Sequence, residues 1–162
     1  MSRPARGLRF AAIPLMFAAA APAAAHVVAD PAEGPAAGYQ AVRFRVGHGC
    51  GQAATTMLRI EIPPEIATAR PQPKPGWRLE TARAGDRISA VAWHGELPGD
   101  QFDEFAVLFK LPAQAGPLRL AVIQTCGTEE VRWDQTSTDG PPPKYPAPNF
   151  QVLPAAGHNH QH

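Results

Sequence analysis

Apolar and polar residues alternate with a period of two in several parts of the chain. In the segments 42–46 and 58–62, every second side chain is apolar and arginine or glutamate stands between them. This period is typical of β-strands with one buried face. Six further segments have a strand-like composition: 77–81, 87–93, 102–110, 118–125, 130–134 and 149–153. No stretch after residue 25 has the spacing of an amphipathic helix, so the pattern predicts an all-β protein.

Proline and glycine separate the predicted strands. The chain of 162 residues contains 19 Pro and 14 Gly, and pairs such as Pro63-Pro64 and Pro98-Gly99 stand where turns are needed. Short strands at close intervals with such connectors predict a two-sheet sandwich, with a cupredoxin-like or fibronectin-III-like appearance. The segment 105–109 is apolar at every position, which predicts a central strand covered on both faces. The segment 136–148 is predicted to be an extended polar connector.

The first 25 residues have the features of a secretory signal peptide. Three arginines precede a mostly apolar stretch at 10–20, and three alanines at 23–25 form a small-residue cleavage site. The apolar stretch is interrupted by proline and is shorter than the roughly 20 residues of a membrane-spanning helix. We therefore expect cleavage after Ala25, a single domain over 26–154, and a flexible His-rich tail over 155–162. The protein is then exported to the periplasm or the cell exterior.

The charge of the chain changes when this leader is removed. The full chain has 15 Lys and Arg against 14 Asp and Glu; the three leader arginines are the only charges in that segment, so residues 26–162 carry 12 against 14. The net charge thus goes from +1 to −2. A near-neutral chain without basic clusters does not indicate nucleic-acid binding. We expect no lipid anchor, and no phosphate loop or serine nucleophile motif is present.

Cys50 and Cys126 are the only cysteines and lie far apart in the sequence. Exported small domains often contain disulfides that supplement a limited core, so we expect this pair to be oxidised. The alternative is a dithiol Cu(I) site, which requires that the pair remain reduced after export.

His26 is the residue with the clearest chemical significance, because cleavage after Ala25 makes it the first residue. Its free α-amine and ring Nδ1 then close a six-membered chelate on one metal ion. Nitrogen donors of this kind favour Cu(II), which also stands at the top of the divalent affinity order. Val28 occupies the third position of the processed chain, which excludes the square-planar site that needs a histidine there. Further ligands must come from elsewhere in the fold.

The chain resembles the YcnI-like copper-binding domain family, formerly described as a domain of unknown function. The resemblance covers almost all of residues 26–154 in order. Its motifs are His26-Val27-Val28, His48-Gly49-Cys50, Pro73-Lys74-Pro75-Gly76-Trp77, Phe102-Asp103-Glu104-Phe105, Gln124-Thr125-Cys126, Val131-Arg132-Trp133 and Tyr145-Pro146-Ala147-Pro148. The resemblance implies a β-sandwich that binds one Cu(II) ion through a mono-histidine brace.

In that family the N-terminal histidine chelates copper, a glutamate supplies an oxygen and a tryptophan lies beside the ion. The resemblance carries these roles to His26, Glu104 and Trp133. Asp103 is the alternative carboxylate if the register differs by one, and strand alternation distinguishes the two because neighbours face opposite sides. Trp77 is the alternative aromatic.

The remaining histidines are given other roles. His48 and His94 are interpreted as structural: His48 lies in a loop next to Cys50, and His94 precedes a glycine in a predicted turn. The tail contains three histidines that alternate with polar residues: His158, His160 and His162. They form either a loose metal-capture segment or an incidental polar end.

The sequence therefore predicts an exported Cu(II)-binding protein that acts in copper acquisition, trafficking or homeostasis and is not an enzyme. Its expected partners are the copper ion and another copper-transfer protein. Two alternatives stay open at this stage. One is a copper-dependent oxidase or monooxygenase, which requires a second histidine in the brace. The other is an immunoglobulin-like interaction module that needs no metal.

Overall fold

The structure, a computed structural model, describes residues 26–137 and 140–155. These residues form twelve strands: β1 (Val27–Asp30), β2 (Glu33–Pro35), β3 (Tyr39–Val46), β4 (Thr55–Glu61), β5 (Thr68–Pro71), β6 (Arg78–Ala84), β7 (Arg87–Leu97), β8 (Asp103–Lys110), β9 (Gly116–Arg119), β10 (Ala121–Cys126), β11 (Glu129–Trp133) and β12 (Asn149–Leu153). The all-β prediction is confirmed. The described part of the chain has no helix long and apolar enough to cross a membrane.

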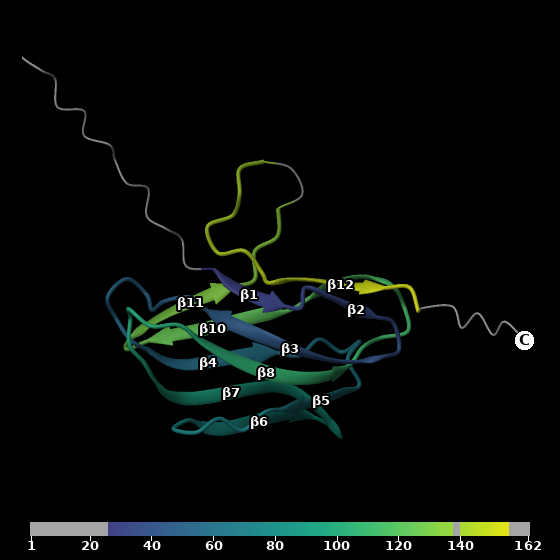
Figure 1. The fold of residues 1–162 in the computed structure, drawn as a ribbon, viewed down its shortest axis with the longest axis horizontal. Coiled ribbons are helices and arrows are strands. Elements are labelled where there is room, and N and C mark those ends of the chain that lie inside the picture. Colours follow the sequence, from purple (N-terminus) through teal and green to yellow (C-terminus); the bar gives the residue numbers. More distant parts are fainter. Residues whose placement is uncertain (1–25, 138–139, 156–162) are drawn as a thin grey trace, which may run out of the picture.

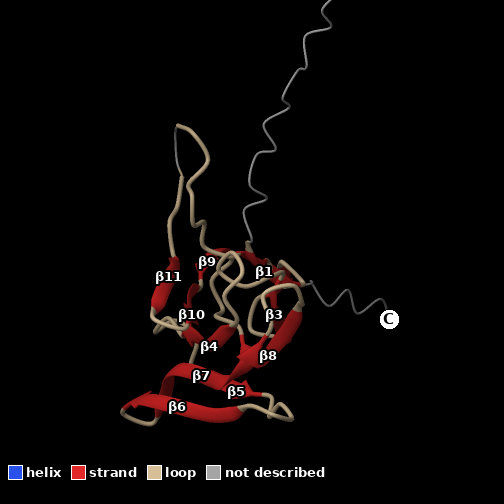
Figure 2. Cartoon of the chain, turned by 90° about the vertical axis from the view of Figure 1, so that its left-hand side faces the viewer, coloured by secondary structure: helices blue, strands red, loops and turns tan. Residues whose placement is uncertain are grey.

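Two main sheets face each other, as the end-on view shows (Figure 2). One has four strands in the order β1-β3-β8-β5, and the other has five in the order β11-β10-β4-β7-β6. A third sheet, β2-β12-β9, lies along the upper side of the sandwich in Figure 1. Its β2–β12 pair is parallel, whereas the ladders of the two main sheets are antiparallel. The two-sheet prediction is confirmed for the two main layers, but it did not include this third sheet.

The core lies between the main sheets and is built from the inward residues of each strand. Phe44 of β3 pairs with Phe105 of β8, and Leu58 of β4 pairs with Trp93 of β7. All four side chains are at most 1% exposed. The Trp93 indole N–H donates to the carbonyl of Gln72 at 3.0 Å, so this large side chain is buried without an unpaired donor.

Two local predictions need correction. Strand β8 lies inside its sheet, as expected, and its inward residues Phe105 and Val107 are buried. The prediction that both faces are covered is wrong: Ala106 and Leu108 on the outer face are partly exposed, because no further layer covers them. His94 does not stand in a turn, because β7 continues to Leu97.

Several strand boundaries also differ from those expected. The single strand expected over 118–125 is divided into β9 and β10, which belong to different sheets. Strands β1, β2 and β5 were not expected: each has only three or four residues, and Pro or Ala weakens its pattern. The predicted signal peptide and residues 156–162 of the tail lie outside the described residues.

The predicted disulfide between Cys50 and Cys126 is present, with a Cα–Cα distance of 5.9 Å. It joins the loop after β3 to the end of β10, across 76 positions of sequence. The same loop is held by a hydrogen bond from the backbone N–H of Gly49 to the carbonyl of Gly99, 3.2 Å long. The disulfide therefore fixes the loop that carries His48.

Candidate metal centre

His26 lies immediately before β1, at the edge of the four-stranded sheet, and its side chain is exposed. Val27 beside it is 2% exposed and pairs with Val46 of β3, so the backbone next to His26 is fixed by the core. The His26 ring lies edge-on to the indole of Trp133, with 6.1 Å between ring centroids and an interplanar angle of 88°. The structure thus brings together two of the three predicted site residues.

Trp133 is the last residue of β11, the edge strand of the five-stranded sheet. Its side chain faces inward and the residue is 4% exposed. Tyr145 packs edge-on against the indole at 5.4 Å, while the indole N–H donates to Oε1 of Gln124 at 3.2 Å. Because the N–H is directed to Gln124, His26 meets the carbon framework of the indole.

Gln124 of β10 uses its whole amide group. Besides accepting from Trp133, its Nε2 donates to the hydroxyl of Thr55 at 2.7 Å and to the backbone carbonyl of His48 at 3.2 Å. Gln124 is 1% exposed, and a buried amide needs such partners. The predicted site residues did not include Gln124, although a glutamine at an inward position of a predicted strand is a signal for a buried polar network.

A cavity of about 460 Å³ adjoins Trp133 and is lined in part by His48, Cys50, Glu129 and Tyr145. His48 Nδ1 lies 2.7 Å from the carbonyl oxygen of Gly49. A carbonyl only accepts, so Nδ1 carries the proton and Nε2 is left free to act as an acceptor or metal ligand in the neutral ring. His48 was interpreted as a loop residue; the structure also places it in the wall of this cavity.

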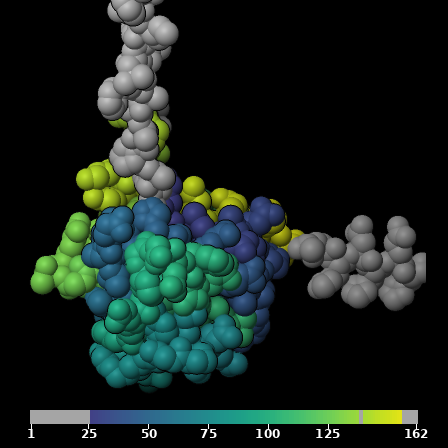
Figure 3. Space-filling model, turned by 60° about the vertical axis from the view of Figure 1, so that its left-hand side comes forward, coloured from purple at the N-terminus to yellow at the C-terminus, as the bar shows by residue number. Residues whose placement is uncertain are grey.

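The connector between β11 and β12 lies over the same end of the molecule. It projects from the body in Figure 1 and contributes the yellow-green surface in Figure 3. The two legs of the connector are joined where Gln135 and Pro146 form a bridge, and the backbone N–H of Gln135 donates to the carbonyl of Tyr145 at 3.1 Å. This pairing holds Tyr145 against Trp133.

Glu104 is placed on the outer face of the four-stranded sheet. It pairs with Arg45 of β3, which in turn pairs with Val28 of β1. Two strand spacings, roughly 10 Å, therefore separate the β1 backbone from that of Glu104. The carboxylate forms an ion pair with Arg43, whose Nε lies 3.5 Å from Glu104 Oε2.

Asp103, the alternative carboxylate, pairs with the buried Val46 and therefore starts on the inward face of the same sheet. Its Oδ1 lies 2.6 Å from Nζ of Lys74. The alternation of β8 thus separates the two carboxylates as expected, with Glu104 on the outer face.

The other aromatic and histidine candidates belong to different parts of the fold. Trp77 packs edge-on against Phe105 at 4.8 Å and is part of the core packing. His94 of β7 lies with its Nε2 3.3 Å from Oε2 of Glu80 on β6. Within residues 26–137 and 140–155, no three His, Cys, Asp or Glu side chains gather closely enough to hold a metal ion by themselves.

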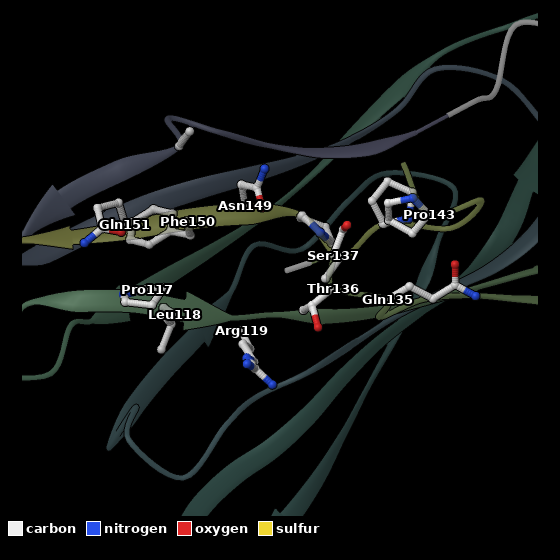
Figure 4. Close-up of a pocket in the computed structure, with 14 residues that line it drawn as sticks. Pro117, Leu118, Arg119, Gln135, Thr136, Ser137, Pro143, Asn149, Phe150 and Gln151 are labelled. Carbon is white, nitrogen blue, oxygen red and sulfur yellow. The ribbon is translucent and has the colours of Figure 1, made fainter. Parts of the chain in front are cut away.

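A second hollow, of about 480 Å³, lies between β9, β12 and the connector (Figure 4). It is lined mainly by proline and neutral polar residues, with Arg119 as its charged member. None of the predicted site residues lines it. This hollow is therefore separate from the candidate metal centre.

Comparison with known proteins agrees with the fold and the sequence resemblance. Residues 26–152 match the model of the family described as "Domain of unknown function (DUF1775)". The chain therefore belongs to this family, the YcnI-like family that the sequence motifs indicated.

Two relatives are informative. The chain is 28% identical over 117 residues to the copper-binding protein CutI of Bacillus subtilis (strain 168); the match covers 70% of this chain and about half the length of that relative. A solved structure is similar with a TM-score of 0.69 and 31% identity, over 81% of this chain and 99% of the other. It is described as an uncharacterized protein from Nocardia farcinica with an immunoglobulin-like fold.

Proposed function

We propose that this protein is exported and binds one Cu(II) ion through a mono-histidine brace at His26. The observation that carries the proposal is the edge-on contact of His26 with Trp133, 6.1 Å between ring centroids, at the residue where the family match begins. The similarity to the copper-binding protein CutI of Bacillus subtilis supports copper as the metal that is bound. Its role is then the acquisition, trafficking or homeostasis of copper, without catalysis, and another exported or membrane copper-transfer protein is its partner.

The donor set follows from the chemistry of the processed chain. In the precursor the nitrogen of His26 is part of an amide bond with Ala25, and cleavage converts it into an amine. The amine and Nδ1 then chelate the ion, and both must be unprotonated to do so. His26 is exposed, so an incoming ion reaches it directly, while the buried Trp133 shields one side of the site.

We assign the oxygen donor to Glu104, on the family resemblance. In the structure its carboxylate pairs with Arg43, and β3 lies between its strand and β1, so binding to copper requires that this exposed ion pair open and that the side chain reach across β3 towards His26. Exposed pairs contribute about 0–1 kcal/mol, which the formation of a metal–oxygen bond readily exceeds. Asp103, which pairs with Lys74, is the alternative oxygen ligand. Glu129, which lines the cavity beside Trp133, is a further carboxylate that the structure makes a candidate.

The test is Cu(II) titration of the exported protein, followed by electron paramagnetic resonance. One equivalent is expected to bind with nitrogen hyperfine structure, and His26→Ala is expected to abolish this signal. A variant acetylated at its N-terminus keeps the imidazole but has no free amine, and it should weaken binding as severely. His94→Ala is the matched control. Unchanged stoichiometric binding in the two N-terminal variants would exclude the brace.

The oxygen ligand is identified by three charge-neutral variants measured in parallel: Glu104→Gln, Asp103→Asn and Glu129→Gln. Glu104→Gln is expected to lower the Cu(II) affinity, whereas the other two leave it unchanged. Loss of affinity in Asp103→Asn or Glu129→Gln instead would move the oxygen ligand and leave the histidine chelate intact.

A copper-dependent oxidase is the second candidate, and the position of His48 gives it a specific basis. His48 lines the cavity against Trp133 and has a free Nε2 in its neutral form. Peroxide-driven oxidation of a glycan by the copper-loaded protein, lost in His48→Ala, is the result that this candidate requires. Cu(II) binding without such turnover is the result expected from a copper carrier.

A further inference from the structure

The outer face of the five-stranded sheet carries a methionine and a histidine side by side. Met57 of β4 pairs with His94 of β7. Their neighbours Leu58 and Trp93 are fully buried in the core, so Met57 and His94 point to the opposite, outer face. Both are partly exposed. Directly paired residues have Cβ atoms about 4.5–5.5 Å apart, close enough for both side chains to reach one ion. Strands β4, β7 and β6 are adjacent in Figure 1.

Glu80 orients the imidazole of His94. Its Oε2 lies 3.3 Å from His94 Nε2 and 3.0 Å from the guanidinium of Arg78. This carboxylate oxygen accepts a hydrogen bond from Arg78 and is also positioned to accept from His94. Nε2 therefore carries the proton, and Nδ1 keeps its lone pair in the neutral ring. A carboxylate that fixes the far nitrogen in this way is the usual support of a metal-binding histidine.

Met57 is the one soft sulfur donor that residues 26–162 offer. The other two methionines are Met1 and Met16, and both cysteines are joined in the disulfide. A thioether does not form disulfides, so it remains a ligand in an oxidising compartment. Thioether donors select Cu(I) over divalent ions, whereas the nitrogen and oxygen donors proposed around His26 suit Cu(II).

We propose that Met57 Sδ and His94 Nδ1 form a Cu(I)-binding site on the outer face of the five-stranded sheet. Cu(I) is a closed-shell ion that accepts two or three donors, so this pair suffices without the third ligand that divalent ions demand. The site is separate from the His26 centre, because Trp133 faces inward from the same sheet whereas Met57 faces outward. It does not depend on the Cu(II) proposal.

The test uses Ag(I), a redox-stable and diamagnetic probe for Cu(I) sites, with the exported protein, residues 26–162, labelled at its methionine methyl group. Met57 is the only methionine of residues 26–162, so it gives the single labelled methyl signal, and this signal is absent from Met57→Leu. We expect the Met57 methyl signal to shift and saturate near one equivalent. His94→Gln should weaken this response at least tenfold, whereas Arg59→Gln, a control change on the same face of β4, should leave it unchanged.

Two results would overturn the site: a Met57 signal that Ag(I) does not move, or an equal response in His94→Gln and the unmodified protein. Met57→Leu is nearly isosteric at a partly exposed position, and amide spectra verify that it folds. A competition titration with a Cu(I) chelator gives the second measurement. Met57→Leu is expected to lose one Cu(I) equivalent and to keep the Cu(II) resonance spectrum of the His26 centre, so failure of either site is seen independently.

Discussion

The indole N–H of Trp133 donates to Oε1 of Gln124, and this bond joins the proposed copper centre to one of only two buried polar residues among those that the structure describes. The same amide holds the backbone of His48 and the hydroxyl of Thr55. The orientation of Trp133 is therefore set from inside the fold by Gln124, together with the packing of Tyr145 against the indole. Gln124 and Thr55, which lie outside the proposed ligand set, thus fix the surroundings of the proposed site.

Replacing Gln124 by leucine should destabilise the protein. The change leaves the indole N–H of Trp133 and the hydroxyl of Thr55 buried without this partner. Each such group costs about 1–3 kcal/mol, so the free energy of unfolding should fall by at least about 2 kcal/mol in urea denaturation. Thr125→Val is the control: its buried Oγ1 has no hydrogen-bond partner among the described residues, so its removal should be neutral or slightly stabilising. Equal losses in both variants would contradict the role given to Gln124.

Much of the fold was predictable because, in the longer strands, apolar and polar residues alternate in the same way as buried and exposed side chains. Segments 42–46 and 58–62 alternate, and the structure forms β3 and β4 there. The short β1, β2 and β5 were missed since their pairing comes from neighbours in space and not from their own three or four residues.

The candidate site was predictable only in part, for a related reason. His26 followed from the chemistry of a new N-terminus, and its contact with Trp133 agrees with the motif. The position of His48 in the cavity wall and the pairing of Met57 with His94 depend on contacts between segments that are far apart in the sequence. Such contacts cannot be predicted from the pattern of neighbouring residues.

Copper bound at His26 should quench the fluorescence of Trp133 more than that of the other tryptophans. Cu(II) quenches indoles at short range, and His26 lies 6.1 Å from the Trp133 ring, whereas Trp77 and Trp93 pack against Phe105. Titration of the exported protein should show quenching that is largely lost in Trp133→Phe and retained in Trp77→Phe. If Trp77→Phe loses it instead, the ion binds at the other end of the core.

Removal of the disulfide should lower stability substantially. The bond closes a loop of 76 positions, and in the chain-entropy model such a loop contributes about 4–5 kcal/mol. The double variant Cys50→Ala, Cys126→Ala should lose a comparable free energy of unfolding, measured by denaturant titration. Reduction of the unmodified protein is the independent check. A loss below about 1 kcal/mol in both experiments would contradict this account.

Asp30 should titrate below its ordinary range. A hydrogen bond from Arg43 holds the pKa of Asp30 below the usual 3.8. A lowered carboxyl pKa contributes stability that is present above the unfolded value and is lost as the pH falls through the folded value. The contribution should therefore begin to decline near pH 4, the unfolded value, and be gone only below the folded pKa. In Arg43→Gln the Asp30 pKa, followed by NMR titration, should rise towards 3.8. An unchanged pKa would show that Arg43 is not its cause.

The same arginine links Asp30 to the proposed oxygen ligand, which allows a test of Glu104 that does not remove it. Arg43 Nε lies 3.5 Å from Glu104 Oε2, so the guanidinium competes with copper for that carboxylate. An exposed pair of this kind contributes up to about 1 kcal/mol, so Arg43→Gln should raise the Cu(II) affinity by up to about fivefold in a competition titration. In the Glu104→Gln background the same substitution should have no effect, because the two residues act through one contact. An equal gain in both backgrounds would mean that Arg43 acts through the general charge of the surface and that Glu104 does not bind the ion.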